Sequence, residues 1–398
     1  MNKDKLWTKD FIVVSSINFF LTLIFYLLMV TIAVFAVDEY HASTSEAGLV
    51  TGIFIIGALI GRLFIGRLIA SFSRRKILYT GLILFTITTS FYFFELGLGF
   101  LLANRLLHGI TLGMASTATG TIVAQIIPAS RKGEGIGYYS MSATLATAIG
   151  PFIGLYLSQH ASFQTIFTFC VALGVLSLLI AFSLTIPPLA GQPKHAAVKG
   201  FSLSSFVEPR ALPIAVITLA VAFCYSSVLS FINFYAMDID LVSTASFFFI
   251  VYAAAVLVSR PFTGRLLDQK GANYVMYPAF VLFAAGLFLL STASTSTVFL
   301  LSGVLIGLGF GNMQSATQAI AVKLTPPHRM GLATSTFFIF LDAGLGFGPY
   351  LLGFVIPVTG YSMLYVILGF AVILSIGLYY MLHGKKEHAS PAEVQASL

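Results

Sequence analysis

Long apolar stretches separated by short polar breaks run along the whole chain. A helix needs about twenty apolar residues to cross the hydrocarbon core of a bilayer. Reading the runs between the breaks predicts an all-α membrane protein with twelve transmembrane helices. The twelve runs lie at about 11–37, 46–70, 76–95, 98–127, 135–158, 162–186, 211–236, 244–266, 273–292, 297–322, 331–357 and 360–382.

The composition strengthens this prediction. Hydrophobic residues make up 58% of the 398 residues and charged ones only 9%, against roughly 25% charged in an average soluble domain. The mean hydropathy is +0.96. So few charges cannot cover a water-facing surface, which disfavours soluble, disordered, coiled-coil and nucleic-acid-binding proteins. The first run is too long for a signal-peptide core and ends in Asp38 and Glu39, so we expect a retained helix.

The basic residues gather on one predicted side of the membrane. Of the 21 Lys and Arg residues, 20 lie on or near that side, and Arg105, inside a predicted helix, is the exception. The other side carries acids instead, among them Glu95 and Asp238. Because cytoplasmic loops are rich in Lys and Arg, we expect both termini in the cytoplasm and an even number of helices.

The chain divides into two halves that repeat each other. Residues 61–68 match residues 259–266 at five of eight positions, at an offset of 264 − 66 = 198. The Gly-Pro pair at 150–151 recurs at 348–349 with the same offset. Parallel repeats of this kind build a large class of transporters, whose halves rock about a central substrate site. We expect an N-terminal six-helix bundle at 1–186, a cytoplasmic linker at 187–210, a C-terminal six-helix bundle at 211–383 and a cytoplasmic tail at 384–398.

Residues 66–75 and residues 264–271 lie at equivalent positions of the two halves. Both segments resemble the loop motif G-x-x-x-D-R-x-G-R-R of the major facilitator superfamily. In that family the acid of the motif is thought to latch the cytoplasmic gate, by capping a helix end and pairing with Arg. The second copy keeps the acid, whereas the first has Ala70 in its place and Ser73 in place of the second glycine, which implies a weaker or different first latch. The gating residues implied are Gly66, Arg67, Arg74 and Arg75 in the first copy, and Gly264, Arg265, Asp268 and Gly271 in the second.

Two further segments are similar to motifs of the same superfamily. Residues 105–113 resemble R-x-x-Q-G-x-x-x-G, with His108 at the glutamine position. Gly150, Pro151 and Gly154 resemble the G-x-x-x-G-P-x-x-G-G motif of drug–proton antiporters, two of whose glycines are replaced here. The resemblance covers essentially the whole chain. It implies the major facilitator fold of two pseudo-symmetric bundles, and a likeness to the twelve-helix drug–proton antiporters of bacteria.

Three ionisable residues inside predicted helices are candidates for proton coupling. Arg105 lies roughly 10 Å below the outer surface at 1.5 Å per residue, where a charge needs a partner or a wet cavity. In a functional role, Arg105 would control proton release or bind an anionic substrate. In a structural role, its side chain would extend to the outer headgroups or donate a hydrogen bond to a helix carbonyl. His108, three residues on, could share a proton relay or be a neutral packing histidine.

Asp342 is the most informative acid. It lies near the middle of the predicted helix 331–357, which has no other charge. A carboxyl that titrates near neutral pH can alternate between protonated and ionised states, as coupling to a proton gradient requires. The alternative is a permanently neutral, hydrogen-bonded aspartic acid that packs beside the glycines of its helix.

Polar and aromatic residues of the central helices are candidate substrate ligands. In mid-membrane such side chains serve equally well as hydrogen-bonded contacts between helices, so the sequence leaves both roles open. The candidates are Asn18, Tyr26, Tyr139, Met141, Tyr225, Asn233, Asn312, Gln314, Gln318 and Phe338.

Together these features predict a proton-coupled secondary transporter of the bacterial inner membrane that exports small, amphipathic, drug-like organic compounds. The sequence carries no recognisable catalytic or nucleotide-binding motif, so we expect no enzymatic activity, no cofactor or metal, and the proton gradient as energy source. The expected partners are a small-molecule substrate, protons and the bilayer, but no nucleic acid, and we expect a monomer. The alternatives are an exporter or symporter of a defined metabolite (a sugar, an organic acid or a metal-chelating small molecule), or a lipid flippase on the same fold.

Overall fold

The computed structural model describes residues 5–68, 73–186 and 206–387, and all regular structure in these ranges is helical. Within them, twelve helices are long and apolar enough to cross a membrane. The predicted fold class, an all-α protein with twelve transmembrane helices, is therefore confirmed. Most of the predicted linker, at 187–205, and of the predicted tail, at 388–398, lies outside the described residues, as does Ala70.

The chain packs as two compact units that exchange two short segments. Unit 1 comprises residues 1–128, 142–208 and 325–339, and unit 2 comprises residues 129–141, 209–324 and 340–398. Two long helices, α5 (Lys132–His160) and α12 (Met330–Gly353), therefore begin in one unit and continue in the other. The boundaries of the two predicted halves, which place each of these helices in a single half, stay a prediction.

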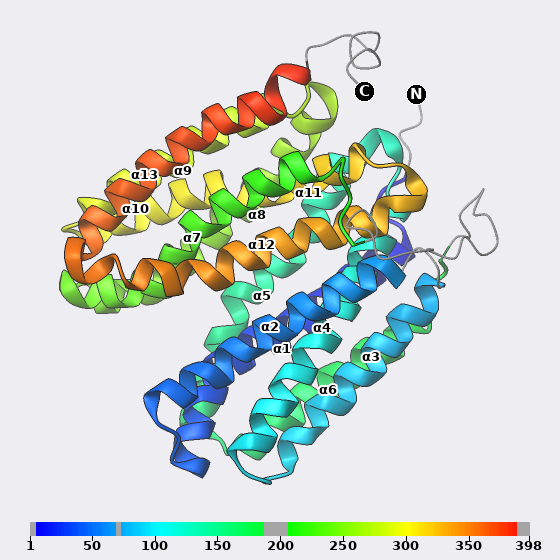
Figure 1. Ribbon diagram of the computed structural model, residues 1–398, viewed down its shortest axis with the longest axis vertical. Helices are drawn as coiled ribbons and strands as arrows, with labels where there is room; N and C mark the ends of the chain where they lie inside the picture. Colours follow the sequence, from blue (N-terminus) through cyan, green and yellow to red (C-terminus); the bar gives the residue numbers. More distant parts are fainter. Residues whose placement is uncertain (1–4, 69–72, 187–205, 388–398) are drawn as a thin grey trace. The chain divides into compact units, whose positions relative to one another are not determined.

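Unit 1 is organised around α4 (Leu98–Ile126), which packs against α1, α2 and α3, while α6 packs against α1 and α3 (Figure 1). From Ala115 to Ala124 every residue of α4 is buried, and most are Ala, Gly, Ser or Thr. Such small side chains let neighbouring helices approach closely. The other elements are α1 (Lys9–Tyr40), α2 (Thr44–Leu68), α3 (Arg74–Ser90), η1 (Phe91–Phe93), α6 (Phe163–Ala181) and η5 (Pro327–Arg329).

Glycines set the closest approach, where α2 crosses α4. A Cβ atom on Gly109 of α4 would collide with the main-chain carbonyl of Phe54, and one on Gly61 of α2 with that of Ile110. A main-chain carbonyl held in a helix cannot move aside as a side chain can. The crossing therefore requires glycine at these positions.

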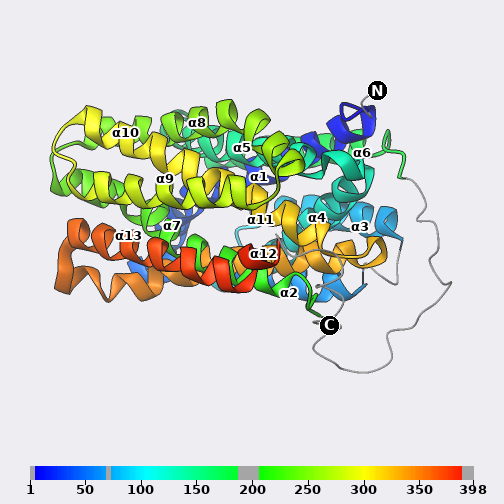
Figure 2. The same ribbon diagram turned by 90° about the horizontal axis from the view of Figure 1, so that it is seen from above.

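Unit 2 has a layer of helices in which α9 lies between α10 and α13, while α8 packs against α10 and α7 packs against α13 (Figures 1 and 2). Its elements are η2 (Ala129–Arg131), α7 (Leu212–Asp238), α8 (Val242–Gln269), α9 (Asn273–Ser291), α10 (Ser296–Ile306), η4 (Gly307–Gly311), α11 (Asn312–Lys323), α13 (Ile356–Leu382) and η6 (Gly384–Lys386).

The predicted helix at 297–322 is built of three pieces. The α-helices α10 and α11 are joined by η4, a π-helical turn of sequence Gly-Leu-Gly-Phe-Gly. Such π-helical turns are rare and often mark functional sites. Here the turn presents the main-chain carbonyl of Gly311 to the Arg260 guanidinium, whose Nη2 donates to it at 2.8 Å.

Candidate functional site

A buried polar cluster surrounds Arg105 in unit 1. The side chain of Arg105 is 1% exposed, and its guanidinium lies 4.3 Å from the centroid of the Phe54 ring. Its Nε donates to the main-chain carbonyl of Val50 at 3.1 Å, and its Nη1 donates to the Tyr92 hydroxyl at 3.1 Å. A cation–π contact and two hydrogen bonds thus replace the water that the guanidinium loses on burial.

His108 belongs to the same cluster. Its Nδ1 lies 2.9 Å from the Tyr92 hydroxyl and its Nε2 lies 3.1 Å from the Thr89 hydroxyl. Tyr92 therefore joins Arg105 to His108, and the structure brings these two predicted coupling residues together. Because the Tyr92 hydroxyl has one hydrogen and accepts from Arg105, it can still donate to an unprotonated Nδ1.

No acid within the described ranges pairs with Arg105. Among the described residues Arg105 takes part in no ion pair, and its Nη2 has no hydrogen-bond partner. An arginine at membrane depth that is only partly satisfied is a strong candidate for function.

A second charged cluster lies in unit 2, at the start of α5. Asp268, near the end of α8, accepts hydrogen bonds from the main-chain N–H groups of Gly133 at 2.7 Å and Glu134 at 2.8 Å. Its Oδ1 also lies 2.7 Å from Lys323 Nζ. The carboxylate thus caps the first turn of α5, where the free N–H groups and the helix dipole favour negative charge.

Glu134 extends this cluster. Its two carboxylate oxygens accept from Arg131 Nε and Arg265 Nε, each at 2.8 Å. The predicted gating residues Arg265 and Asp268 thus act on the same turn of α5, and Glu134, which was not among the predicted residues, connects them. An acid three residues after a basic residue at a helix start was the available signal.

The other motif residues whose side chains are described lie in packed positions or at helix ends, and the side chain of Arg67 lies outside the described part. Gly264 leaves room for the main chain of Glu134, and Gly271 follows α8 with φ at +96°. In unit 1, Gly66 faces Ser335. The Arg75 guanidinium lies 5.6 Å from the Tyr79 ring centroid, and Arg74 is buried at the start of α3.

Gly150 and Gly154 of the predicted antiporter motif lie against α1. A Cβ atom on Gly150 would be 2.8 Å from the Tyr26 Cβ, and one on Gly154 would be 2.9 Å from the Leu27 carbonyl. Pro151 follows Gly150 inside α5.

The predicted substrate ligands divide between the units. Unit 1 holds Asn18, whose Nδ2 donates to the Ser142 hydroxyl at 2.9 Å, Tyr26, and Phe338, which lies under the Arg62 guanidinium at 4.4 Å. Unit 2 holds the remaining seven: Tyr139, Met141, Tyr225, Asn233, Asn312, Gln314 and Gln318.

Several of the unit 2 candidates bond to neighbouring helices. Asn312 donates to the Ser259 hydroxyl at 2.8 Å and accepts from the Thr263 hydroxyl at 2.9 Å, so it joins α11 to α8. Tyr225 stacks on Phe310 with a centroid distance of 3.9 Å. The sequence left two roles open for Asn312, ligand contact and hydrogen bonding between helices. Its contacts are hydrogen bonds between helices.

The remaining candidates differ in exposure. Gln318 is buried and its Oε1 lies 3.4 Å from the Ser140 hydroxyl, whereas Asn233 is exposed. Asp342 is partly buried in the unit 2 part of α12.

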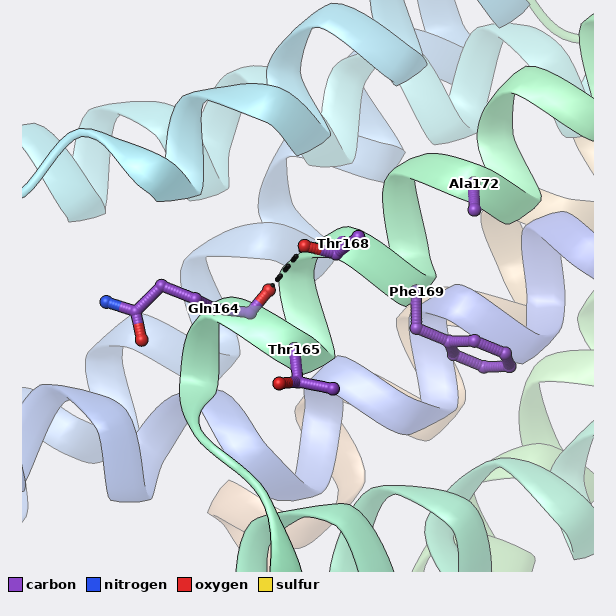
Figure 3. Close-up of a pocket in the computed structure, with 5 residues that line it drawn as sticks. All are labelled: Gln164, Thr165, Thr168, Phe169 and Ala172. Atoms are coloured by element: carbon purple, nitrogen blue, oxygen red, sulfur yellow. Dashed lines mark hydrogen bonds between the residues drawn. The ribbon is translucent and has the colours of Figure 1, made fainter.

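Figure 3 shows a shallow hollow whose lining comes from α6 alone. Its polar side chains are largely satisfied locally: the Thr168 hydroxyl donates to the Gln164 carbonyl at 2.7 Å, and the Gln164 side chain donates to Glu95 at 3.3 Å. The hollow contains none of the candidate residues. In the described ranges, no three His, Cys, Asp or Glu side chains are grouped as a metal ion would need.

Twelve helices of membrane-spanning length in the described ranges, a repeated sequence and a capping acid at a helix start are the features of a polytopic membrane transporter. The chain belongs to the major facilitator superfamily, whose family model matches residues 14–341 and 242–397.

Three relatives align over most of the chain. It is 27% identical to an uncharacterized MFS-type transporter of Methanocaldococcus jannaschii, over 84% of this chain and 87% of that one. It is 23% identical to multidrug resistance protein 1 of Bacillus subtilis, over 96% of both chains. It is 21% identical to the staphylopine export protein of Staphylococcus aureus, over 94% of this chain and 96% of the other.

Two solved structures share the fold. The human organic anion transporter MFSD10 matches with a TM-score of 0.78 at 14% identity, over 93% of this chain and 98% of that one. FucP in its outward conformation matches with a TM-score of 0.76 at 16% identity, over 95% and 99% of the two chains. The predicted superfamily is confirmed by the match to the family model, whereas the likeness to solved structures shows the fold alone.

Proposed function

We propose that the chain exports small, amphipathic organic compounds in exchange for protons, by alternating access, across a bacterial inner membrane with both termini in the cytoplasm. One relative that aligns over nearly the whole chain is named an export protein and another is named a multidrug resistance protein, which supports the direction. The placement of Lys and Arg supports the orientation. The expected partners remain one small-molecule substrate, protons and lipid, with the chain as a monomer.

One observation carries the proton coupling. Among the acids in the described membrane spans, only Asp342 lies more than ten residues from both ends of its span. That span is Pro327–Gly353, so the distances are 342 − 327 = 15 and 353 − 342 = 11 residues. The other acids of the spans lie near an end, where water and headgroups can reach them. A carboxylic acid that can change its ionisation inside the membrane is what exchange against protons needs.

The proposed cycle assigns a step to each candidate. Asp342 takes a proton from the outer side and releases it to the cytoplasm. Arg105, His108 and Tyr92 form the polar cluster that we assign to controlling that release. Substrate leaves when the transporter opens outward.

Inside-out vesicles with an acidic lumen and a pH-sensitive dye test this proposal. Adding cationic and neutral amphipathic compounds should trigger proton release in the wild type and not in Asp342→Asn. Asp238→Asn, which changes an exposed acid at the end of α7, should respond like the wild type. Full proton release by Asp342→Asn would remove Asp342 from the mechanism.

A second candidate function is export of one defined metabolite. It is favoured by the relative named for staphylopine export. If no amphipathic compound triggers proton release from wild-type vesicles, this candidate replaces the first, and the panel should change to metal-chelating metabolites, organic acids and sugars.

A further inference from the structure

The two units hold the starts of α5 and α12 by different means. The repeat offset places Ala70 opposite Asp268, since 268 − 198 = 70, and Leu332 opposite Glu134, since 134 + 198 = 332. Ala70 and Leu332 have no carboxylate, so they cannot take the roles that Asp268 and Glu134 have in unit 2. Arg329, opposite Arg131 at 131 + 198 = 329, is kept.

Glu208, in the segment just before α7, supplies an acid to the start of α12. Its carboxylate, with the side chain only 3% exposed, accepts from Arg329 Nε. Its main-chain N–H donates to the Thr336 hydroxyl at 2.9 Å, and that hydroxyl donates in turn to the Leu332 carbonyl at 2.8 Å. Glu208 thus holds η5, directly before α12, through its side chain, and the second turn of α12 through its main chain.

The repeat does not account for this contact. The same offset places Asp10 opposite Glu208, since 208 − 198 = 10. Asp10 is partly exposed, and its Oδ1 accepts from the main-chain N–H of Thr185 at 2.8 Å. Asp10 therefore bonds to the segment after α6, whereas Glu208 bonds to the start of α12.

The contact bears on a helix that both units share. Residues 325–339 belong to unit 1 and residues 340–353 of α12 to unit 2. Besides Glu208, unit 1 holds the start of α12 through the Ser335 hydroxyl, which donates to the Arg62 carbonyl at 2.6 Å. A conformational change that draws the start of α12 away from unit 1 must break these bonds.

We propose that Glu208 is a positioning residue of the transport cycle: its bonds to Arg329 and Thr336 fasten the start of α12 to unit 1, as Asp268 fastens the start of α5 in unit 2. The proposal rests on alternating access in the proposed function. The Arg329 side chain is 36% exposed. Water can therefore solvate its guanidinium as soon as the ion pair with Glu208 breaks, which allows the contact to form and break reversibly during the cycle.

Hydrogen exchange of the full-length protein in lipid nanodiscs, without substrate, tests the fastening. In Glu208→Gln the main-chain amides of 325–339 should exchange about ten-fold faster, because a charged hydrogen bond is lost from the closed state. The exchange rates of the main-chain amides of 132–137, at the helix start that Asp268 caps, should not change. Asp10→Asn, the matched control at the repeat position, should leave 325–339 as in the wild type.

A double-mutant cycle separates the ion pair from general loosening. Arg329→Gln should give the same acceleration, and the double variant Glu208→Gln/Arg329→Gln should add little to either single variant. Unchanged exchange in Glu208→Gln, or fully additive effects, would overturn the proposal. Because the exchange measurement needs no substrate, accelerated exchange combined with a silent proton-release assay would reject export of amphipathic compounds and leave the fastening in place.

Discussion

The same position of the two repeats carries a buried arginine in unit 1 and a glycine in unit 2. The offset places Gly303 opposite Arg105, since 105 + 198 = 303, and Phe248 opposite Val50, since 50 + 198 = 248. In unit 1 Arg105 reaches the Val50 carbonyl, whereas in unit 2 the Phe248 ring closes on Gly303, where a Cβ atom would be 3.1 Å away.

The rest of the polar cluster is also confined to unit 1. Ile306 stands opposite His108, and Leu290 opposite Tyr92. Apolar packing therefore closes the same kind of helix crossing in unit 2. Since the fold can be built without the Arg105 cluster, the cost of burying its charge supports the role in transport proposed above.

The helix crossings themselves offer the largest expected effect on stability. Gly109→Ala should lower the free energy of unfolding by about 3 kcal/mol, because its Cβ atom meets a main-chain carbonyl that cannot yield. Gly307→Ala, its counterpart, should cost less, since the nearest atom there is the Tyr252 carbonyl at 2.7 Å beside the π-helical turn. Denaturant unfolding in detergent measures both.

Gly99→Ala is the control for this pair. Gly99 lies in α4 as Gly109 does, but a Cβ atom on Gly99 would meet nothing within 4 Å. The substitution should be neutral or slightly stabilising, because alanine is the better helix former. Equal losses in Gly99→Ala and Gly109→Ala would show that close approach is not the reason for the glycine.

An intermediate effect is expected from Tyr92→Phe, which removes the hydroxyl that joins Arg105 to His108. Two buried polar groups then lose a partner, and the free energy of unfolding should fall by about 2 kcal/mol. Tyr156→Phe, which removes an exposed hydroxyl, is the matched control and should be neutral. A neutral Tyr92→Phe would mean that the cluster does not depend on this bridge.

The smallest change in stability is expected from Arg105→Met, which imitates the apolar packing of unit 2. Val50 keeps its helical hydrogen bond and Tyr92 keeps His108, so the free energy of unfolding should change by less than about 1.5 kcal/mol. Transport in the vesicle assay should nevertheless fall at least ten-fold, about 1.4 kcal/mol in rate terms. Lys385→Met, which changes an exposed lysine, should transport like the wild type. Normal transport by Arg105→Met would make the arginine structural.

Local signals in the sequence were sufficient for much of the fold. The length of each apolar run predicted all twelve spans, because a run is made of consecutive residues. The constant offset of 198 predicted the repeat, because it can be read by comparing the two halves of the sequence without any structure. The π-helical turn η4 was missed because Gly-Leu-Gly-Phe-Gly is equally compatible with an α-helix. Glu134 and Tyr92 were missed because neither belongs to the motif segments that carried the prediction.

The class of protein and the number of spans follow from composition and spacing, and the family follows from the resemblance of the motif segments, so the sequence alone was enough for them. How the buried charges are satisfied was settled only by tertiary contacts: Arg105 by Tyr92 and the Val50 carbonyl, Asp268 by the start of α5, and Glu208 by Arg329, 121 residues away in the chain. The reason is physical. A hydrogen bond needs two groups within about 3 Å, and which helix faces meet at that distance is fixed by packing across the whole chain.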